Sequence, residues 1–190
     1  MNWLVFGLVA WVALGLELGL RPAMAIGDTP VAPSFVLPLV VFVALHASAK
    51  HARWAALLMG LLLDLTWAIP VRDAPPVVLA GPYALGMLLA AQLVLTLRGV
   101  VISKNPLTLV VVTLFAGIVL QIVVVALVTL RAIPLPWLGD VTAWRPAAEL
   151  IRRLGAAAYT AGVALPLSFV LYALQPAFSF HTTGAQRRFG

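Results

Sequence analysis

Long apolar runs separated by short polar links dominate the chain. Each run approaches the roughly 20 residues that a helix needs to cross about 30 Å of hydrocarbon at about 1.5 Å per residue. The pattern therefore predicts an all-α membrane protein, a six-transmembrane-helix bundle that forms a single integral membrane domain over residues 1–190. The predicted spans are residues 3–20, 34–49, 53–69, 77–97, 107–130 and 154–174.

Prolines and glycines predict where the spans bend or begin. Pro38 and Pro166 fall inside predicted spans and should kink them, because proline removes a helical hydrogen bond. Pro82 follows Gly81 and suits the first position of a helix. Residues 77–80 are then expected to form a non-helical entry strand against the bundle.

Three segments need a separate interpretation. Residues 141–153 predict an amphipathic helix that lies in the membrane interface with its leucines and isoleucine dipping inward. Residues 181–190 read as a polar tail. Residues 23–25 have the small-x-small form of a signal-peptidase site, but no basic region precedes the first apolar run, so we expect that run to stay an uncleaved span.

The Lys and Arg residues of the short links predict the orientation. Six of them lie on the side of the two termini and six lie on the opposite side, which is a tie. Setting aside the three arginines of residues 141–155, as part of the interfacial helix, leaves six against three. This count favours both termini in the cytoplasm.

Composition narrows the class of protein further. The 190 residues are 63% hydrophobic and 9% charged, whereas a soluble domain averages about a quarter charged residues. With no cysteine, the chain has no disulfide, thiol nucleophile or Cys-based metal site. The net charge of +6 comes from cations scattered between apolar runs, which favours contact with anionic lipid headgroups over nucleic acid.

Candidate catalytic groups are sparse. His46 and His51 are spaced five apart and lack a metal-ligand pattern such as HExxH, so we interpret them as interfacial histidines. Ser168 lacks the glycine-flanked turn of a nucleophile. Glu17 is expected near the outer headgroups, paired with Arg21 four residues on. We therefore expect no catalytic residues, no metal site and no cofactor.

Asp64 is the most informative residue, because a carboxylate inside an apolar span costs about 2.5–3.5 kcal/mol on insertion scales. Helical rise places Asp64, Gly86 and Gly117 in one layer near mid-membrane, and Gly60 lies one turn below Asp64. Small residues let helices approach closely. Asp64 is then either a structural clasp between helices or a ligand for an ion or substrate, and we expect Asp64→Asn to be tolerated if it is a clasp.

These residues also carry a family likeness. The stretch GLLLDL contains Gly60 and Asp64, the stretch GPYALG begins at Gly81, and a basic residue, Arg98, closes the next span. Together they resemble the rod shape-determining protein MreD family, with matching positions at Gly60, Asp64, Gly81, Ala84, Leu85 and Arg98. MreD-like chains are also similar to the substrate-binding components of energy-coupling-factor vitamin transporters.

The resemblance implies a non-enzymatic, multi-pass scaffold of the bacterial inner membrane. It would bind an MreC-like membrane protein and, through it, an MreB-like cytoskeleton and the peptidoglycan polymerase and transpeptidase. The alternative is a substrate-binding subunit of a vitamin or small-solute transporter, which predicts a closed polar pocket near Tyr83, Gln121 and Thr160. An intramembrane hydrolase fits least, because no base accompanies a nucleophile.

Overall fold

The computed structural model describes residues 1–27, 29, 31–66, 68–71, 74–78, 80–100, 105–131 and 145–180. These residues form six α-helices, a short 3₁₀ helix and one β-hairpin. The α-helices are α1 (Trp3–Gly19), α2 (Val36–His46), α3 (Ala49–Thr66), α4 (Pro82–Leu97), α5 (Pro106–Arg131) and α6 (Pro146–Leu174). The predicted helical bundle is therefore confirmed at the level of its six helices. The predicted polar tail at 181–190 lies outside the described residues.

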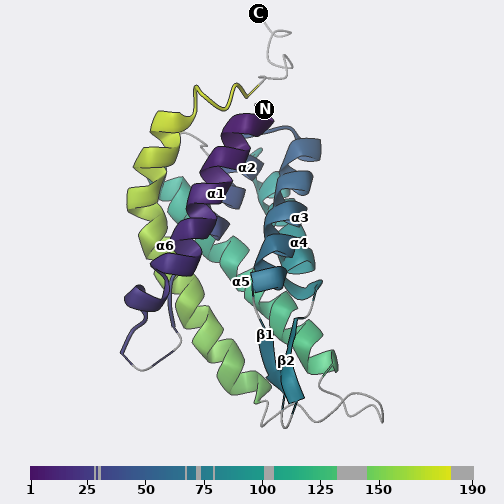
Figure 1. The fold of residues 1–190 in the computed structure, drawn as a ribbon. Coiled ribbons are helices and arrows are strands. Elements are labelled where there is room, and N and C mark those ends of the chain that lie inside the picture. Colours follow the sequence, from purple (N-terminus) through teal and green to yellow (C-terminus); the bar gives the residue numbers. More distant parts are fainter. Residues whose placement is uncertain are drawn as a thin grey trace, which may run out of the picture.

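The start of α1 and the end of α6 lie at the same end of the bundle (Figure 1). The backbone N–H of Asn2 donates to the carbonyl oxygen of Phe178 over 2.8 Å, which ties the two ends together. At this end the side chain of Asn2 also caps α1, accepting from the N–H of Leu4 over 3.1 Å. The opposite end of the molecule holds the hairpin and the first turns of α6.

The central element is α2, which contacts each of the other five α-helices. All of its residues from Val36 to Leu45 are buried. With 11 residues it is about 16 Å long, shorter than the predicted span over 34–49. Pro38 is its third residue, where the missing N–H would have no intrahelical partner, so the expected kink at Pro38 is wrong.

A β-hairpin joins α3 to α4, where the sequence predicted helix up to residue 69. Strand β1 (Ala68–Val71) pairs antiparallel with β2 (Ala74–Val78), in the register Ala68 with Val78. Prolines at 70, 75 and 76 explain the correction, since proline in a helix interior removes a hydrogen bond and clashes with the preceding turn. The expected extended entry to α4 is found in the end of β2, and Pro82 begins the helix as predicted.

The last helix corrects a second expectation. Helix α6 runs without interruption through 29 residues, including Pro166, and residues 146–153 are its first two turns. The separate interfacial helix predicted over 141–153 is therefore wrong for its described part, because residues 146–153 continue directly into α6 and Arg153 bonds Tyr83 of α4 and Gln121 of α5. The count of six cations against three set aside the arginines of this segment as part of a separate interfacial helix. Because that helix is not separate, the count no longer favours one orientation.

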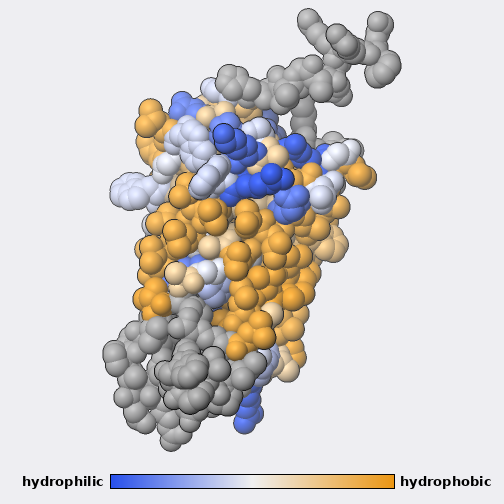
Figure 2. Space-filling model, turned by 90° about the vertical axis from the view of Figure 1, so that its right-hand side faces the viewer, coloured by the Kyte–Doolittle hydropathy of each residue, from blue (hydrophilic) through white to orange (hydrophobic). Residues whose placement is uncertain are grey.

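Of the helices that the structure describes, two are long and apolar enough to cross a membrane, in the segments Pro106–Leu130 and Pro146–Leu174. Helices α1, α2 and α4 are apolar but shorter. Large apolar side chains are exposed on the helices around α2, including Trp11 at 76% and Phe169 at 62%. On the face seen in Figure 2, a largely hydrophobic band lies below a hydrophilic cap. Soluble monomers rarely expose apolar patches of this extent, so these features suggest a membrane protein.

Candidate functional site

Asp64 lies in the last turn of α3 and caps the start of α4. One carboxylate oxygen accepts the backbone N–H groups of Gly81, over 2.9 Å, and Ala84, over 3.0 Å. The other oxygen accepts the N–H of Tyr83 over 2.8 Å. The side chain is 2% exposed, so these three donors replace the water that a carboxylate would otherwise bind.

Glu17 performs the same task near the end of α1, where it caps the start of α2. One of its oxygens accepts the N–H of Phe35 over 2.6 Å, the N–H of Val36 over 3.4 Å and the hydroxyl of Ser34 over 3.0 Å. The other oxygen pairs with the guanidinium of Arg21 over 2.8 Å, as the i, i+4 spacing predicted. Glu17 is buried, so its carboxylate faces the inside of the bundle and not the surface.

The two caps share one physical logic. Neither Phe35 nor Gly81, the N-cap residues of α2 and α4, provides a side-chain cap of its own. The first N–H groups of a helix have no intrahelical acceptor and carry partial positive charge. A carboxylate on the preceding helix supplies both the acceptor and the negative charge. Each acid precedes the residues that it caps by 17 to 20 positions.

These contacts agree with the structural interpretation of Asp64 rather than with a ligand role. Asp64 binds Tyr83 through the backbone N–H and not through the hydroxyl, and the buried hydroxyl of Thr113 has no hydrogen-bond partner within the described residues. Among those residues, no three His, Asp or Glu side chains come together in a way that could hold a metal ion.

A third polar group involves Arg153, which sequence reasoning assigned to the interfacial helix. Its Nη1 donates to the hydroxyl of Tyr83 over 3.0 Å and to Oε1 of Gln121 over 3.4 Å. Its Nε donates to Glu149 over 2.7 Å, and Arg152 pairs with the same carboxylate. The i, i+4 spacing of Glu149 and Arg153 was the available signal that this part of α6 is helical and paired.

A small cavity lies between these polar groups. It is lined from all six α-helices, by the polar residues Glu17, Tyr83, Gln121 and Thr160 and by apolar side chains that include Leu37 and Leu63. Its volume is about 20 Å³, enough for one water molecule. Sites for small organic ligands have volumes of about 300–1,000 Å³. The polar pocket expected near Tyr83, Gln121 and Thr160 is therefore present in place and composition, but in this conformation it has no room for a vitamin.

The glycines set the spacing between successive helices. A Cβ atom on Gly60 would lie 2.6 Å from Cα of Ala84, so α3 and α4 are in backbone contact there. A Cβ on Gly86 would lie 2.6 Å from Leu120 of α5, and one on Gly117 would lie 3.1 Å from Ala157 of α6. Each glycine thus serves a different helix pair. Helix α3 begins four residues before the predicted span, which places Asp64 about one turn further along the bundle.

The remaining predicted site residues surround the start and end of α4. Gly81 has a φ of 130°, a conformation that favours glycine, and this geometry aims its N–H at Asp64. Ala84 is buried against Gly60, whereas Leu85 is 47% exposed and faces outward. Arg98 follows the end of α4, and its Nη1 donates over 2.9 Å to the carbonyl of Ala47, which ends α2.

Comparisons with known proteins found no match: no family model, no curated protein and no solved structure is similar to this chain.

Proposed function

We propose that this chain is a non-enzymatic, multi-pass scaffold of the bacterial inner membrane that belongs to the rod elongation complex. In this proposal it binds an MreC-like protein with a single membrane span, and through it an MreB-like cytoskeleton and the peptidoglycan polymerase and transpeptidase. Both termini lie in the cytoplasm, with Lys50, Arg53 and Arg98 on the same side. The sequence resemblance to the MreD family motivates the proposal.

The observation that carries it is the outer face of α1. Leu4, Leu8, Trp11, Gly15 and Leu18 recur at spacings of four, three, four and three, and all of them are exposed. The three largest exposures are 85% for Leu4, 76% for Trp11 and 66% for Leu8. This alternation of four and three is the spacing with which one helix packs against another, and it supports a partner-binding face on α1. A Cβ on Gly15 would meet nothing within 4 Å, so a partner backbone can approach closely there.

The acidic side chains support a scaffold over an enzyme. Catalytic acids and bases need to reach a substrate, but Glu17 and Asp64 are occupied in holding the first N–H groups of α2 and α4. Glu149 is paired with two arginines of its own helix. In the described part of the chain, these three acids thus stabilise helix ends. In this proposal the chain acts through contacts that its helix surfaces make with partner proteins.

Crosslinking tests this proposal directly, because the chain has no cysteine and one introduced residue is unique. Leu8→Cys would be co-expressed with the MreC-like protein from the same genome, carrying single cysteines along its span. We expect disulfide-linked heterodimers from Leu8→Cys. The matched control is Ile122→Cys, an exposed apolar position on α5, which should give none. Equal crosslinking from both positions, or failure of the two proteins to co-purify in mild detergent, would overturn the proposal.

A second candidate, the substrate-binding subunit of a vitamin or small-solute transporter, is favoured by the cavity near Tyr83, Gln121 and Thr160. That function would need the bundle to open, since the cavity holds about one water. Denaturing the purified chain and analysing the released small molecules separates the two functions. A stoichiometric vitamin, with no cell-wall partner recovered, would establish the transporter alternative.

A further inference from the structure

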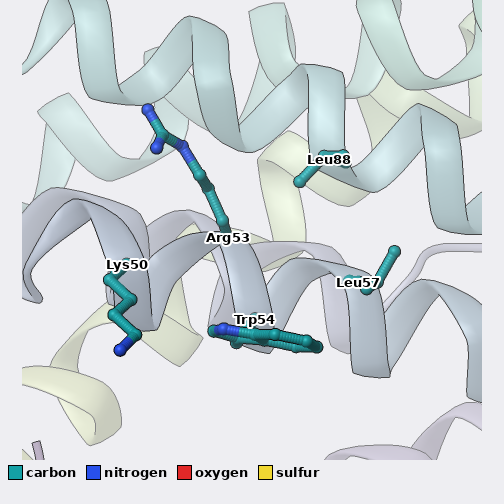
Figure 3. A pocket seen from close by; sticks show the side chains of 5 residues that line it. All are labelled: Lys50, Arg53, Trp54, Leu57 and Leu88. Atoms are coloured by element: carbon teal, nitrogen blue, oxygen red, sulfur yellow. The ribbon is translucent and has the colours of Figure 1, made fainter.

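A groove lies on the surface of the molecule between α3 and α4, towards the end of the bundle where α1 begins and α6 ends. It has a volume of about 310 Å³ and is lined by Lys50, Arg53, Trp54, Leu57 and Leu88. Figure 3 shows Arg53 reaching from α3 towards α4 and Leu88 pointing back from α4, with Lys50 and Leu57 at opposite ends of the group. Helices α3 and α4 are in backbone contact at Gly60. About two turns before that contact, at Arg53, the groove lies between them.

The groove changes from cationic to apolar along α3. Lys50 and Arg53 are in its first turns, and Leu57 is about 10 Å further along the helix than Lys50. Across the groove, Gln92 of α4 is next to Arg53, and Leu88 lies one turn deeper. Trp54, which is 51% exposed, sits between the two halves, as aromatic residues do at the boundary between headgroups and hydrocarbon.

Arg53 is positioned for an anion. Its Nε donates to Oε1 of Gln92 over 3.1 Å, which fixes the plane of the guanidinium. The terminal Nη groups have no partner within the described residues, so both can donate to one phosphate in a bidentate arrangement. Lys50, about one turn before Arg53 on α3, also lines the groove and adds a second positive charge to it. No acidic side chain lines the groove.

We propose that this groove binds one anionic phospholipid, with its phosphate on Lys50 and Arg53 and an acyl chain against Leu57 and Leu88. An amphiphile of this kind matches both halves of the groove, whereas a free phosphate matches only the first. Each cation near a membrane surface contributes about a fivefold preference for anionic lipid, so the pair should give a preference of about 30-fold. The proposal requires membrane insertion but does not depend on the scaffold function.

Native mass spectrometry of the full chain in detergent tests the proposal, with phosphatidylglycerol and phosphatidylcholine of equal chain length as probes. We expect one retained phosphatidylglycerol per chain, about 30-fold preferred, and loss of that preference in the double variant K50Q/R53Q. The swap K50R/R53K keeps both charges but loses the bidentate contact of Arg53, so it should keep a smaller preference than the unmodified chain and a larger one than K50Q/R53Q. Glycerol 3-phosphate should not displace the lipid, because it lacks the apolar half.

The matched control is R145Q/R152Q, which removes two exposed cations from the other end of the bundle and should bind as the unmodified chain does. Equal retention of the two lipids by the unmodified chain would overturn the proposal. So would an unchanged preference in K50Q/R53Q, or displacement of the lipid by glycerol 3-phosphate. Circular dichroism of each variant confirms that its helices are intact before the lipids are compared.

Discussion

Asp64→Leu should weaken the contact between α3 and α4 and lower the free energy of unfolding. Asp64→Asn should lower it by a smaller amount. The three N–H groups held by Asp64 differ in burial: those of Tyr83 and Ala84 are buried, whereas that of Gly81 is partly exposed. In Asp64→Leu the Gly81 N–H can find another acceptor, and the two buried donors cannot. An unsatisfied buried donor costs about 1–3 kcal/mol, so we expect a loss of about 2–6 kcal/mol in the free energy of unfolding.

The same geometry makes asparagine a partial replacement, contrary to the expectation that it would be tolerated. Its carbonyl oxygen can take the place of the oxygen that accepts from Gly81 and Ala84. Its amide NH₂ must then face the N–H of Tyr83, and two donors cannot bond each other. One buried donor is lost, so the expected cost is about 1–3 kcal/mol, together with the lost charge at the helix start.

Unfolding of the purified chain by sodium dodecyl sulfate in mixed micelles, followed by circular dichroism, measures these differences. Leu65→Ala serves as the control, since Leu65 is 57% exposed in the same turn of α3 and should change stability little. The reasoning predicts the order of stability as unmodified chain, then Asp64→Asn, then Asp64→Leu. Equal losses in Asn and Leu would show that the charge itself is required, and no loss in Leu would refute the capping role.

The other predictions use the same unfolding assay. Glu17→Leu should cost more than Asp64→Leu, because it also removes the carboxylate that pairs with the partly buried guanidinium of Arg21; an equal or smaller loss would contradict this. Gly60→Ala should destabilise the chain by about 1–3 kcal/mol through overpacking, whereas Gly162→Ala, with open space at its Cβ, should be neutral or stabilising by up to about 1 kcal/mol. Arg98→Gln should cost about 0.5–1.5 kcal/mol through the lost bond to the carbonyl of Ala47, and no change would show that water replaces it.

Some of the site could be read from spacing alone, and some could not. The pairing of Glu17 with Arg21 follows from their i, i+4 positions, and the sequence predicted it. The acceptance of backbone N–H groups by Glu17 and Asp64 depends on where the following helix begins. That position is decided by the length and course of a connecting segment, which apolar periodicity does not specify.

The sequence by itself determined that this chain forms six helices, because the lengths and interruptions of its apolar runs are local properties. It also marked Asp64 and Gly60 as unusual, since a carboxylate and a glycine in an apolar helix both need a compensating contact. Only the tertiary structure decided what those contacts are. It enclosed the short α2 on all sides, continued α6 through residues expected in the interface, and placed each buried acid at the start of the next helix. The reason is physical: burial and hydrogen bonding at these sites depend on which helix ends meet in space, and that arrangement is a property of the packed bundle.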